Sequence, residues 1–429
     1  MGNPTFLQLV KTPPYPKAGG GTALLAPAMK DKKASIGFIF VTVLISVIGL
    51  GIIIPVMPEL IAELTGGSNS QASRYGGGLL FVYAFFQFLF SPILGGLSDR
   101  YGRRPVLLFS LFGLGMDYLV LAFAPTIGWL FLGRTIAGVC GASFTTASAY
   151  VADISEPDKR SQNFGLMGAA FGLGFTIGPV VGGLLGEYGS RMPFFASAGL
   201  ALLNGLYGYF ILPESLSKEN RRPFDLKRAN PVGTLLHLRK YPVILGLVIS
   251  LFFIYLAQHA SHSTWAYFTI EKFDWSKAQV GYSLGFVGLM IIIVQGGVIR
   301  PVIKAFGQEK TAYIGLLFYV LGMFLIGIAS APWMIYAFMV PYAIGGLAGP
   351  ALQGIMTGQV SPKEQGELQG GLTSLMSVSS IIGPPLMTGV FSFFTGVNTP
   401  FYFPGAPFIL GTFFALVSVA ISIKALNNP

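Results

Sequence analysis

The chain has 429 residues, of which 53% are apolar and 10% are charged, and its formal net charge at pH 7 is +10. Soluble domains carry about 25% charged residues, and a soluble protein of this length needs far more polar surface to cover its core. The composition therefore excludes a soluble enzyme, a secreted disulfide scaffold and a disordered chain. It indicates an all-α membrane protein with many spans. The single cysteine, Cys140, excludes an intrachain disulfide.

Residues 1–33 differ from the rest of the chain. Prolines at positions 13, 14 and 16 and glycines at 19–21 break any helix, and no apolar stretch typical of a cleavable signal occurs there. We expect a disordered cytoplasmic tail over 1–33.

The remainder contains apolar runs of about 20 residues, the length that crosses about 30 Å of hydrocarbon. Twelve such spans are predicted. They cover residues 34–61, 76–97, 105–125, 127–152, 163–186, 192–212, 241–269, 279–303, 311–331, 333–360, 368–395 and 403–425.

Lys and Arg are distributed unevenly among the gaps between these spans. Most of them fall in the gaps on the same side as the N-terminus. The exceptions in the opposite gaps are Arg74, Arg191, Lys272 and Lys277. The positive-inside rule then places both termini in the cytoplasm. The basic balance therefore reflects topology and anionic inner-leaflet lipid, so we expect no nucleic-acid partner.

Glycine and proline markers repeat at an offset of 205 residues. This offset relates Gly102 to Gly307, Pro157 to Pro362, Gly165 to Gly370, and Gly178-Pro179 to Gly383-Pro384. Several markers on one offset predict two six-helix halves, 34–212 and 241–425, joined by a basic cytoplasmic linker, 213–240, and followed by a short tail, 426–429. Two parallel six-helix repeats with a substrate site between them describe the major facilitator architecture.

The loop between spans 2 and 3 reads Gly95-Gly-Leu-Ser-Asp99-Arg100-Tyr-Gly102-Arg103-Arg104-Pro105. It resembles the signature loop of the major facilitator superfamily. A role in setting the membrane orientation would explain the arginines, but it would explain neither Asp99 nor the glycine spacing. The resemblance implies that Asp99, supported by Arg100, Gly102, Arg103 and Arg104, latches the two halves against a helix N-terminus, where a carboxylate is favoured.

Span 5 carries small residues at helical spacing and ends in a Gly-Pro-x-x-Gly-Gly pattern. The pattern comprises Gly174, Gly178, Pro179, Gly182 and Gly183. Plain close packing of helices explains these residues as well as a functional role does. The pattern resembles the motif of drug–proton antiporters in the same superfamily. Runs at 116–123, 133–134, 350–354 and 365–370 resemble the tetracycline-efflux group.

The chain departs from that group at two intramembrane positions. Where the best-known members carry an aspartate in span 1, this sequence has Ser46, and span 9 contains no carboxylate. A metabolite facilitator or symporter therefore remains an alternative to a proton-coupled exporter. A second alternative is a sensor or scaffold that moves no substrate.

Ionisable groups inside spans are costly and are therefore functional candidates. Asp117 in span 3 and Arg134 in span 4 lie at the same depth on either side of a short turn, so they can pair across the hairpin. The pair is either a structural ion pair or a site where a proton or substrate competes for Asp117. His259 and His262 in span 7 share one helix face near the outer end. They are either groups that bind an external proton or ordinary polar residues at the membrane interface.

Further polar side chains within the spans are candidates for lining a substrate cavity, or alternatively for bonding between helices. They are Ser46, Gln87, Gln258, Gln295 and Gln353. The sequence shows no phosphate-binding loop and no Cys/His spacing for a metal, so we expect neither an enzyme nor a cofactor or metal.

The resemblance as a whole implies a secondary transporter of the bacterial inner membrane that works by alternating access. We expect it to export an amphipathic small molecule, such as a tetracycline-like drug, in exchange for protons. Its expected partners are that substrate, protons and membrane lipids, and we expect a monomer.

Overall fold

The computed structural model describes residues 25–427 except 142, 157–158, 225–241 and 361–364. The helices of the first half are α1 (Leu25–Ile52), α2 (Met57–Thr65), α3 (Asn69–Tyr101), α4 (Arg103–Ala122), α5 (Ile127–Gly141), α6 (Ser143–Ile154), α7 (Arg160–Gly186) and α8 (Met192–Ile211). The helices of the second half are α10 (Pro242–Phe273), α11 (Lys277–Ile293), α12 (Ile299–Ile328), α13 (Pro332–Ile344), α14 (Ala348–Gly358), α15 (Gln365–Thr395) and α16 (Ala406–Asn427). The described residues are almost entirely helical and contain no strand.

Within the described residues, eleven helical runs are long and apolar enough to cross a membrane. One of them, Lys277–Ile328, has 52 residues and contains both of the predicted spans 279–303 and 311–331. Gly307 divides this run because its φ of 77° is not helical. The twelve predicted spans are therefore all present, and the eighth and ninth are joined by a short break.

Several spans consist of two helices separated by a bend. Residues Ile54–Val56 form a single 3-10 turn between α1 and α2, at Pro55. A similar turn, Gly345–Leu347, separates α13 from α14. Hydrophobic length predicts such a span as one unit, but proline removes a backbone donor and glycine weakens the helix, which divides the span in two.

The repeat at 205 residues has a backbone counterpart. Gly102, between α3 and α4, has a φ of 109°, and Gly307 has a φ of 77°. Both values lie in the region that favours glycine. Pro179 lies inside α7 and Pro384 lies inside α15, so this pair also occupies equivalent places. The pair Pro157 and Pro362 falls outside the described residues.

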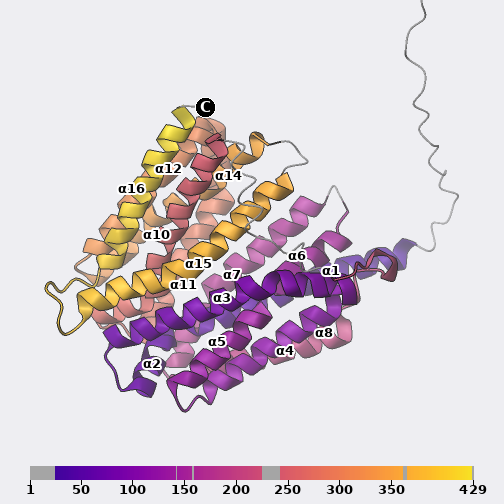
Figure 1. Cartoon of the computed structure of the whole chain (residues 1–429), viewed down its shortest axis with the longest axis horizontal. Coiled ribbons are helices and arrows are strands. Elements are labelled where there is room, and N and C mark those ends of the chain that lie inside the picture. Colours follow the sequence, from indigo (N-terminus) through magenta and orange to yellow (C-terminus); the bar gives the residue numbers. More distant parts are fainter. Residues whose placement is uncertain (1–24, 142, 157–158, 225–241, 361–364, 428–429) are drawn as a thin grey trace, which may run out of the picture.

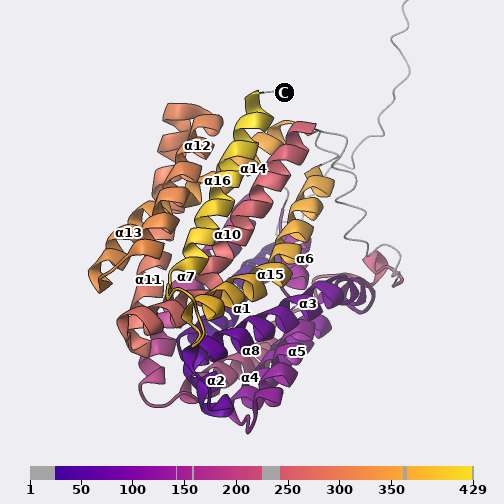
Figure 2. The same ribbon diagram turned by 60° about the vertical axis from the view of Figure 1, so that its left-hand side comes forward.

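The two halves form two bundles that meet at one end and diverge at the other (Figures 1 and 2). Closely packed pairs of helices join the halves: α3 with α15, and α7 with α11. The bundles meet at the ends that the charge pattern places outside. They spread toward the ends predicted to be cytoplasmic, so the structure is inward-facing.

The predicted ends of the halves need two adjustments. Helix α1 begins at Leu25, so residues 25–33 of the predicted tail are helical, while residues 1–24 lie outside the described part. The short tail after 425 is reduced because α16 continues to Asn427. Of the predicted linker 213–240, only residues up to 224 are described, and Phe224 lies against Gly96 of α3.

Candidate functional site

A cavity of about 210 Å³ lies between the halves. Its walls come from α1, α2, α3 and α5 of the first half and from α10 of the second. They consist of Leu50, Ile53, Ile54, Met57, Gly76, Leu79, Leu80, Tyr83, Arg134, His262, Ser263, Trp265, Ala266 and Tyr267. A second cavity of about 40 Å³ shares Ile54, His262 and Trp265 with it, so the two adjoin. The lining is mostly apolar with a few polar groups, which is typical of small-molecule sites.

Asp117 and Arg134 form the ion pair that hairpin symmetry predicts. The Arg134 Nη2 atom donates to Asp117 Oδ2 between α4 and α5. Asp117 is 0% exposed and Arg134 is 5% exposed. A buried charge without a partner is costly, so each residue of this pair stabilises the other.

The pair leaves two polar atoms without a hydrogen-bond partner among the described residues. These atoms are Asp117 Oδ1 and Arg134 Nε. Arg134 also lies 6.0 Å from the ring centroid of Tyr83, a cation–π distance. The guanidinium is thus held by a carboxylate on one side, borders the cavity, and retains an unused N–H group.

The two histidines of α10 occupy different surroundings. Their ring centroids are 6.1 Å apart, as the shared helix face predicts. His262 borders both cavities and has solvent-accessible surface. His259 packs against α15, where a β-carbon added at Gly383 would lie 2.2 Å from its ring. The structure therefore brings His262 to the cavity with Arg134 and places His259 against a helix of its own half.

None of the five predicted polar cavity residues is among the residues that line these two cavities. Gln87 instead bonds within its half, donating to Tyr83 Oη at 3.3 Å and to the Gly141 carbonyl at 3.2 Å. Gln295 is exposed, and the remaining three are half-buried: Ser46, Gln258 and Gln353. Within the described part of the chain, no cluster of three or more His, Cys, Asp or Glu side chains is placed to hold a metal ion.

The glycine-rich helix α7 contacts a helix on each side. Against α1, β-carbons added at Gly178 and Gly182 would lie 2.7 Å from the Ile48 carbonyl oxygen and 1.9 Å from that of Ile52. Against α11, one added at Gly183 would lie 2.4 Å from the Lys277 carbonyl oxygen. The other two predicted motif residues also lie at the α1 contact, Gly174 beside Val47 and Pro179 beside Gly51. The close packing that the pattern predicts is therefore present, and Gly183 contributes to the contact between the halves.

Hydrogen bonds close the outer end between α3 and the helices α10 and α15. Asn69 Nδ2 donates to the Tyr267 carbonyl and to Glu271 Oε2, each at 2.9 Å. Ser70 donates to the Ser392 carbonyl at 2.9 Å, and Arg74 Nε donates to Ser392 Oγ at 2.7 Å.

A second outer contact joins α2 and the end of α7 to the start of α11. Lys277 Nζ lies 2.6 Å from Glu59 Oε2 and donates to the Gly186 carbonyl at 2.8 Å. Glu187 accepts a hydrogen bond from the Ala278 amide at 3.0 Å. That bond, followed by bonding from Ser276 and the charge of Lys277, lowers the pKa of Glu187. A carboxylate of one half therefore lies at the N-terminus of a helix of the other half.

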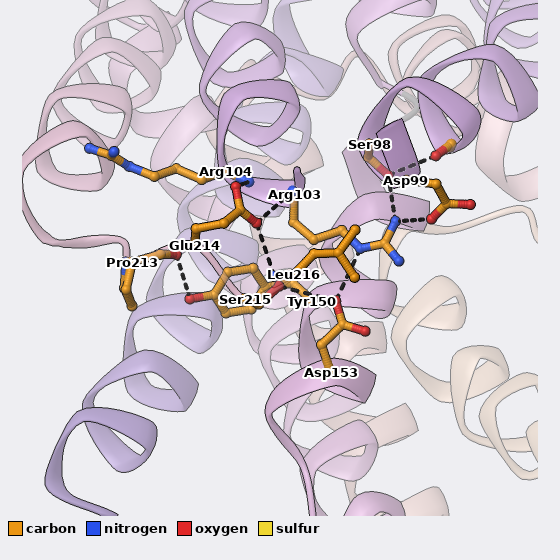
Figure 3. A network of polar contacts seen from close by, with 11 residues as sticks. Ser98, Asp99, Arg103, Arg104, Tyr150, Asp153, Pro213, Glu214, Ser215 and Leu216 are labelled. Carbon is orange, nitrogen blue, oxygen red and sulfur yellow. Dashed lines mark hydrogen bonds and ion pairs between the residues drawn. The ribbon is translucent and has the colours of Figure 1, made fainter. Parts of the chain in front are cut away.

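The cytoplasmic loop is organised around Arg103 (Figure 3). Its Nη1 donates to Asp99 Oδ1 at 2.5 Å and to Ser98 Oγ at 2.7 Å, and its Nε donates to Asp153 Oδ2 at 3.1 Å. All these residues belong to the first half. Among the described residues Asp99 therefore contacts no helix N-terminus of the second half in this inward-facing state, unlike the engaged latch that the resemblance implies.

Glu214, at the start of the linker, is the carboxylate that lies on a helix N-terminus in this loop. Its carboxylate accepts from the Arg103 amide at 2.8 Å and from the Arg104 amide at 3.3 Å, at the N-terminus of α4 (Figure 3). Of the other predicted latch residues, Arg104 also donates to the Tyr209 carbonyl, and Arg100 lies over the ring of Tyr101.

Sequence reasoning did not identify Tyr267, Glu187 or Glu214 as site residues. A signal was available for Glu187, because it follows the Gly182-Gly183 pattern and faces a helix that Ser276 caps. Tyr267 gave no signal, since a tyrosine in an apolar span is ordinary.

Comparisons with known proteins agree with this arrangement. The family model of the Major Facilitator Superfamily matches residues 39–303 and 296–425. The class C tetracycline resistance protein of Escherichia coli is 40% identical over 364 residues, which cover 85% of this chain and 91% of that protein. The class E protein of Escherichia coli is 38% identical, covering 82% of this chain and 86% of that protein.

Among solved structures, a bacterial homologue of the human lysosomal transporter Spinster, in its inward-facing and unoccupied conformation, superposes with a TM-score of 0.74. Its sequence identity is 15%, over 92% of this chain and 97% of that one, so this likeness concerns the fold. With the matching family model and relatives of this identity along most of its length, the chain belongs to the major facilitator superfamily of membrane transporters.

Proposed function

We propose that this chain exports an amphipathic small molecule across the inner membrane in exchange for protons, and that tetracyclines are the first substrates to test. The similarity to tetracycline resistance proteins along most of the chain supports the substrate class. The inward-facing structure supports alternating access, because it corresponds to one of the two end states of that cycle.

The observation that carries the proposal is the place of Arg134. This residue bonds Asp117 on one side and borders the cavity between the halves on the other. Ionised Asp117 fixes the guanidinium through Nη2 and leaves Nε free for an acceptor atom of the substrate. A proton on Asp117 removes the charge that holds Arg134, and the binding geometry is lost.

Proton and substrate thereby weaken each other's binding, which an exchanger requires. By linkage, a proton that lowers the affinity for substrate implies a substrate that lowers the affinity for the proton. Such mutual exclusion lets a proton gradient drive the substrate outward. His262, which borders the same cavity, is a second ionisable side chain at this site.

The test uses inverted membrane vesicles, in which export appears as uptake. Wild-type vesicles with an acidic interior should accumulate tetracycline, and dissipating the gradient should stop accumulation. Asp117→Asn should abolish gradient-driven uptake and also weaken exchange of labelled for unlabelled tetracycline, because asparagine, like the protonated aspartate, carries no charge to hold Arg134. Asp274→Asn is the matched control, since Asp274 is exposed at the outer end, and should behave as wild type.

Two results would contradict the proposal. Wild-type uptake that ignores the gradient would favour a facilitator, and full gradient-driven uptake by Asp117→Asn would move coupling away from this residue.

The stability of the folded protein provides a check on the ion pair, because removing one partner of a buried pair costs about 3–5 kcal/mol. The double variant Asp117→Asn/Arg134→Gln should therefore be more stable than Asp117→Asn alone.

A further inference from the structure

Tyr267 of α10 projects across the boundary between the halves. Its side chain is 5% exposed and lies against Gly76 of α3, where an added β-carbon would lie 2.0 Å from the tyrosine Oη atom. The Tyr267 carbonyl accepts from Asn69 Nδ2 at 2.9 Å, and its ring packs at an angle on Phe391 of α15. Three helices therefore fix the position of this ring, and both Tyr267 and Gly76 border the larger cavity.

The hydroxyl of Tyr267 has no hydrogen-bond partner among the described residues. Burying a hydroxyl without a partner costs free energy, and such groups call for a specific explanation. A phenylalanine would fill the same space without that cost, so packing alone does not account for the hydroxyl.

Two other polar groups of the same cavity, Ser263 and Tyr83, are already bonded. Ser263 donates to the His259 carbonyl at 2.5 Å, and the Tyr83 hydroxyl accepts from Gln87 Nε2 at 3.3 Å. Among the lining residues, the buried side-chain polar atoms left without a partner in the described structure are Tyr267 Oη and Arg134 Nε. One is on the second half, the other is on the first half, and both are donors.

We propose that the Tyr267 hydroxyl is a substrate-recognition group that donates a hydrogen bond to an acceptor oxygen of the transported molecule. This inference rests on the proposed function and narrows its substrate class. The ligand is a largely apolar molecule with at least two acceptor oxygens, one for Tyr267 and one for Arg134 Nε. Since the two donors belong to different halves, such a ligand bridges them.

The test compares Tyr267→Phe with wild type in purified, detergent-solubilised protein, using tetracycline as the probe. Without ligand, Tyr267→Phe should melt at the wild-type temperature or higher, because the hydroxyl has no partner to lose. The affinity for tetracycline should fall about three- to tenfold, the loss expected for one neutral hydrogen bond. The stabilisation by saturating tetracycline should fall in parallel.

Tyr319→Phe is the matched control. Tyr319 of α12 is also buried, at 4% exposure, but borders neither cavity. Its substitution should leave tetracycline affinity unchanged.

Different outcomes overturn different statements. Wild-type protein that neither binds nor transports tetracycline overturns the proposed function, and the inference with it. Wild-type transport with unchanged affinity in Tyr267→Phe overturns the inference alone. A lower melting temperature of ligand-free Tyr267→Phe would show that the hydroxyl has a structural partner, which also overturns it.

Discussion

The outer and cytoplasmic ends of the molecule both place a carboxylate on a helix N-terminus, but they connect different parts. At the outer end Glu187 of the first half accepts from the Ala278 amide of the second half. At the cytoplasmic end Glu214 accepts from the Arg103 and Arg104 amides, all within the first half and its linker. The outer bond must therefore break whenever the outer side opens, while the cytoplasmic bond can persist through the cycle. The same physical contact thus acts as a gate at one end and as a fastening at the other.

The largest effect on the contact between the halves is expected from an added side chain at Gly183. Gly183→Ala places a methyl group 2.4 Å from the Lys277 carbonyl oxygen, and overpacking of this kind costs about 1–3 kcal/mol. We expect the ratio of outer-closed to outer-open molecules to fall about tenfold. Closure of the outer side is measured by disulfide formation in the variant Ser70→Cys/Ser392→Cys, made in a Cys140→Ser background. The two serine hydroxyl oxygens are 3.2 Å apart in the closed structure.

Gly168→Ala is the control for this variant. Gly168 lies on the same helix, and an added β-carbon there meets nothing within 4 Å. Equal crosslinking in Gly183→Ala and Gly168→Ala would show that the α7–α11 contact does not determine closure.

The next largest effect concerns the cytoplasmic loop. Asp99→Asn should lower the transport rate several-fold, because a latch that forms in the opposite state needs the charge, while insertion depends on apolar length. Since the Asp99 side chain pairs with Arg103 of its own half here, crosslinking of Ser70→Cys/Ser392→Cys should not fall. Wild-type transport at matched expression would remove the latch role from Asp99.

A direct comparison of the two ends uses Glu187→Gln and Glu214→Gln. Glu187→Gln should lower outer crosslinking about two- to fivefold, the scale of a charge at a helix terminus, with an unchanged melting temperature. Glu214→Gln should lower the melting temperature by a few degrees and leave crosslinking unchanged. The reverse pattern would mean that the two carboxylates have exchanged the roles assigned to them.

The smallest effect is expected from external pH. The hydrogen bond from Ala278 lowers the pKa of Glu187, so this contact stabilises closure above the ordinary glutamate pKa of about 4.3 and is lost only as pH falls below that value. Outer crosslinking should therefore be constant between about pH 5 and 8. A marked drop near pH 6 would assign outer opening to a group other than Glu187.

Much of the fold could be predicted from sequence because it depends on local quantities. Apolar length gave the spans, and the turn between α4 and α5 brought Asp117 and Arg134 together at equal depth. The positive φ of Gly102 and Gly307 likewise follows from a marker visible in the repeat.

The remaining features depend on contacts between distant residues. Tyr267 meets Gly76 only because α10 and α3 pack across the boundary of the halves. Asp99 is paired with Arg103 of its own half in this inward-facing structure, and a partner in the second half is an expectation for the opposite state. The sequence encodes both end states of a transporter, so it does not specify which partners a gate residue has in either one.

The two positive-φ glycines, Gly102 and Gly307, also differ in what surrounds them. At Gly102 an added β-carbon would meet the Glu214 carboxylate at 2.2 Å, whereas at Gly307 it would meet nothing within 4 Å. One linker joins the two halves, and the carboxylate of its Glu214 lies at the turn of the first half. The second half has a positive-φ glycine without the fastening, so a side chain at 307 is limited by the backbone angle alone, whereas one at 102 must also displace Glu214.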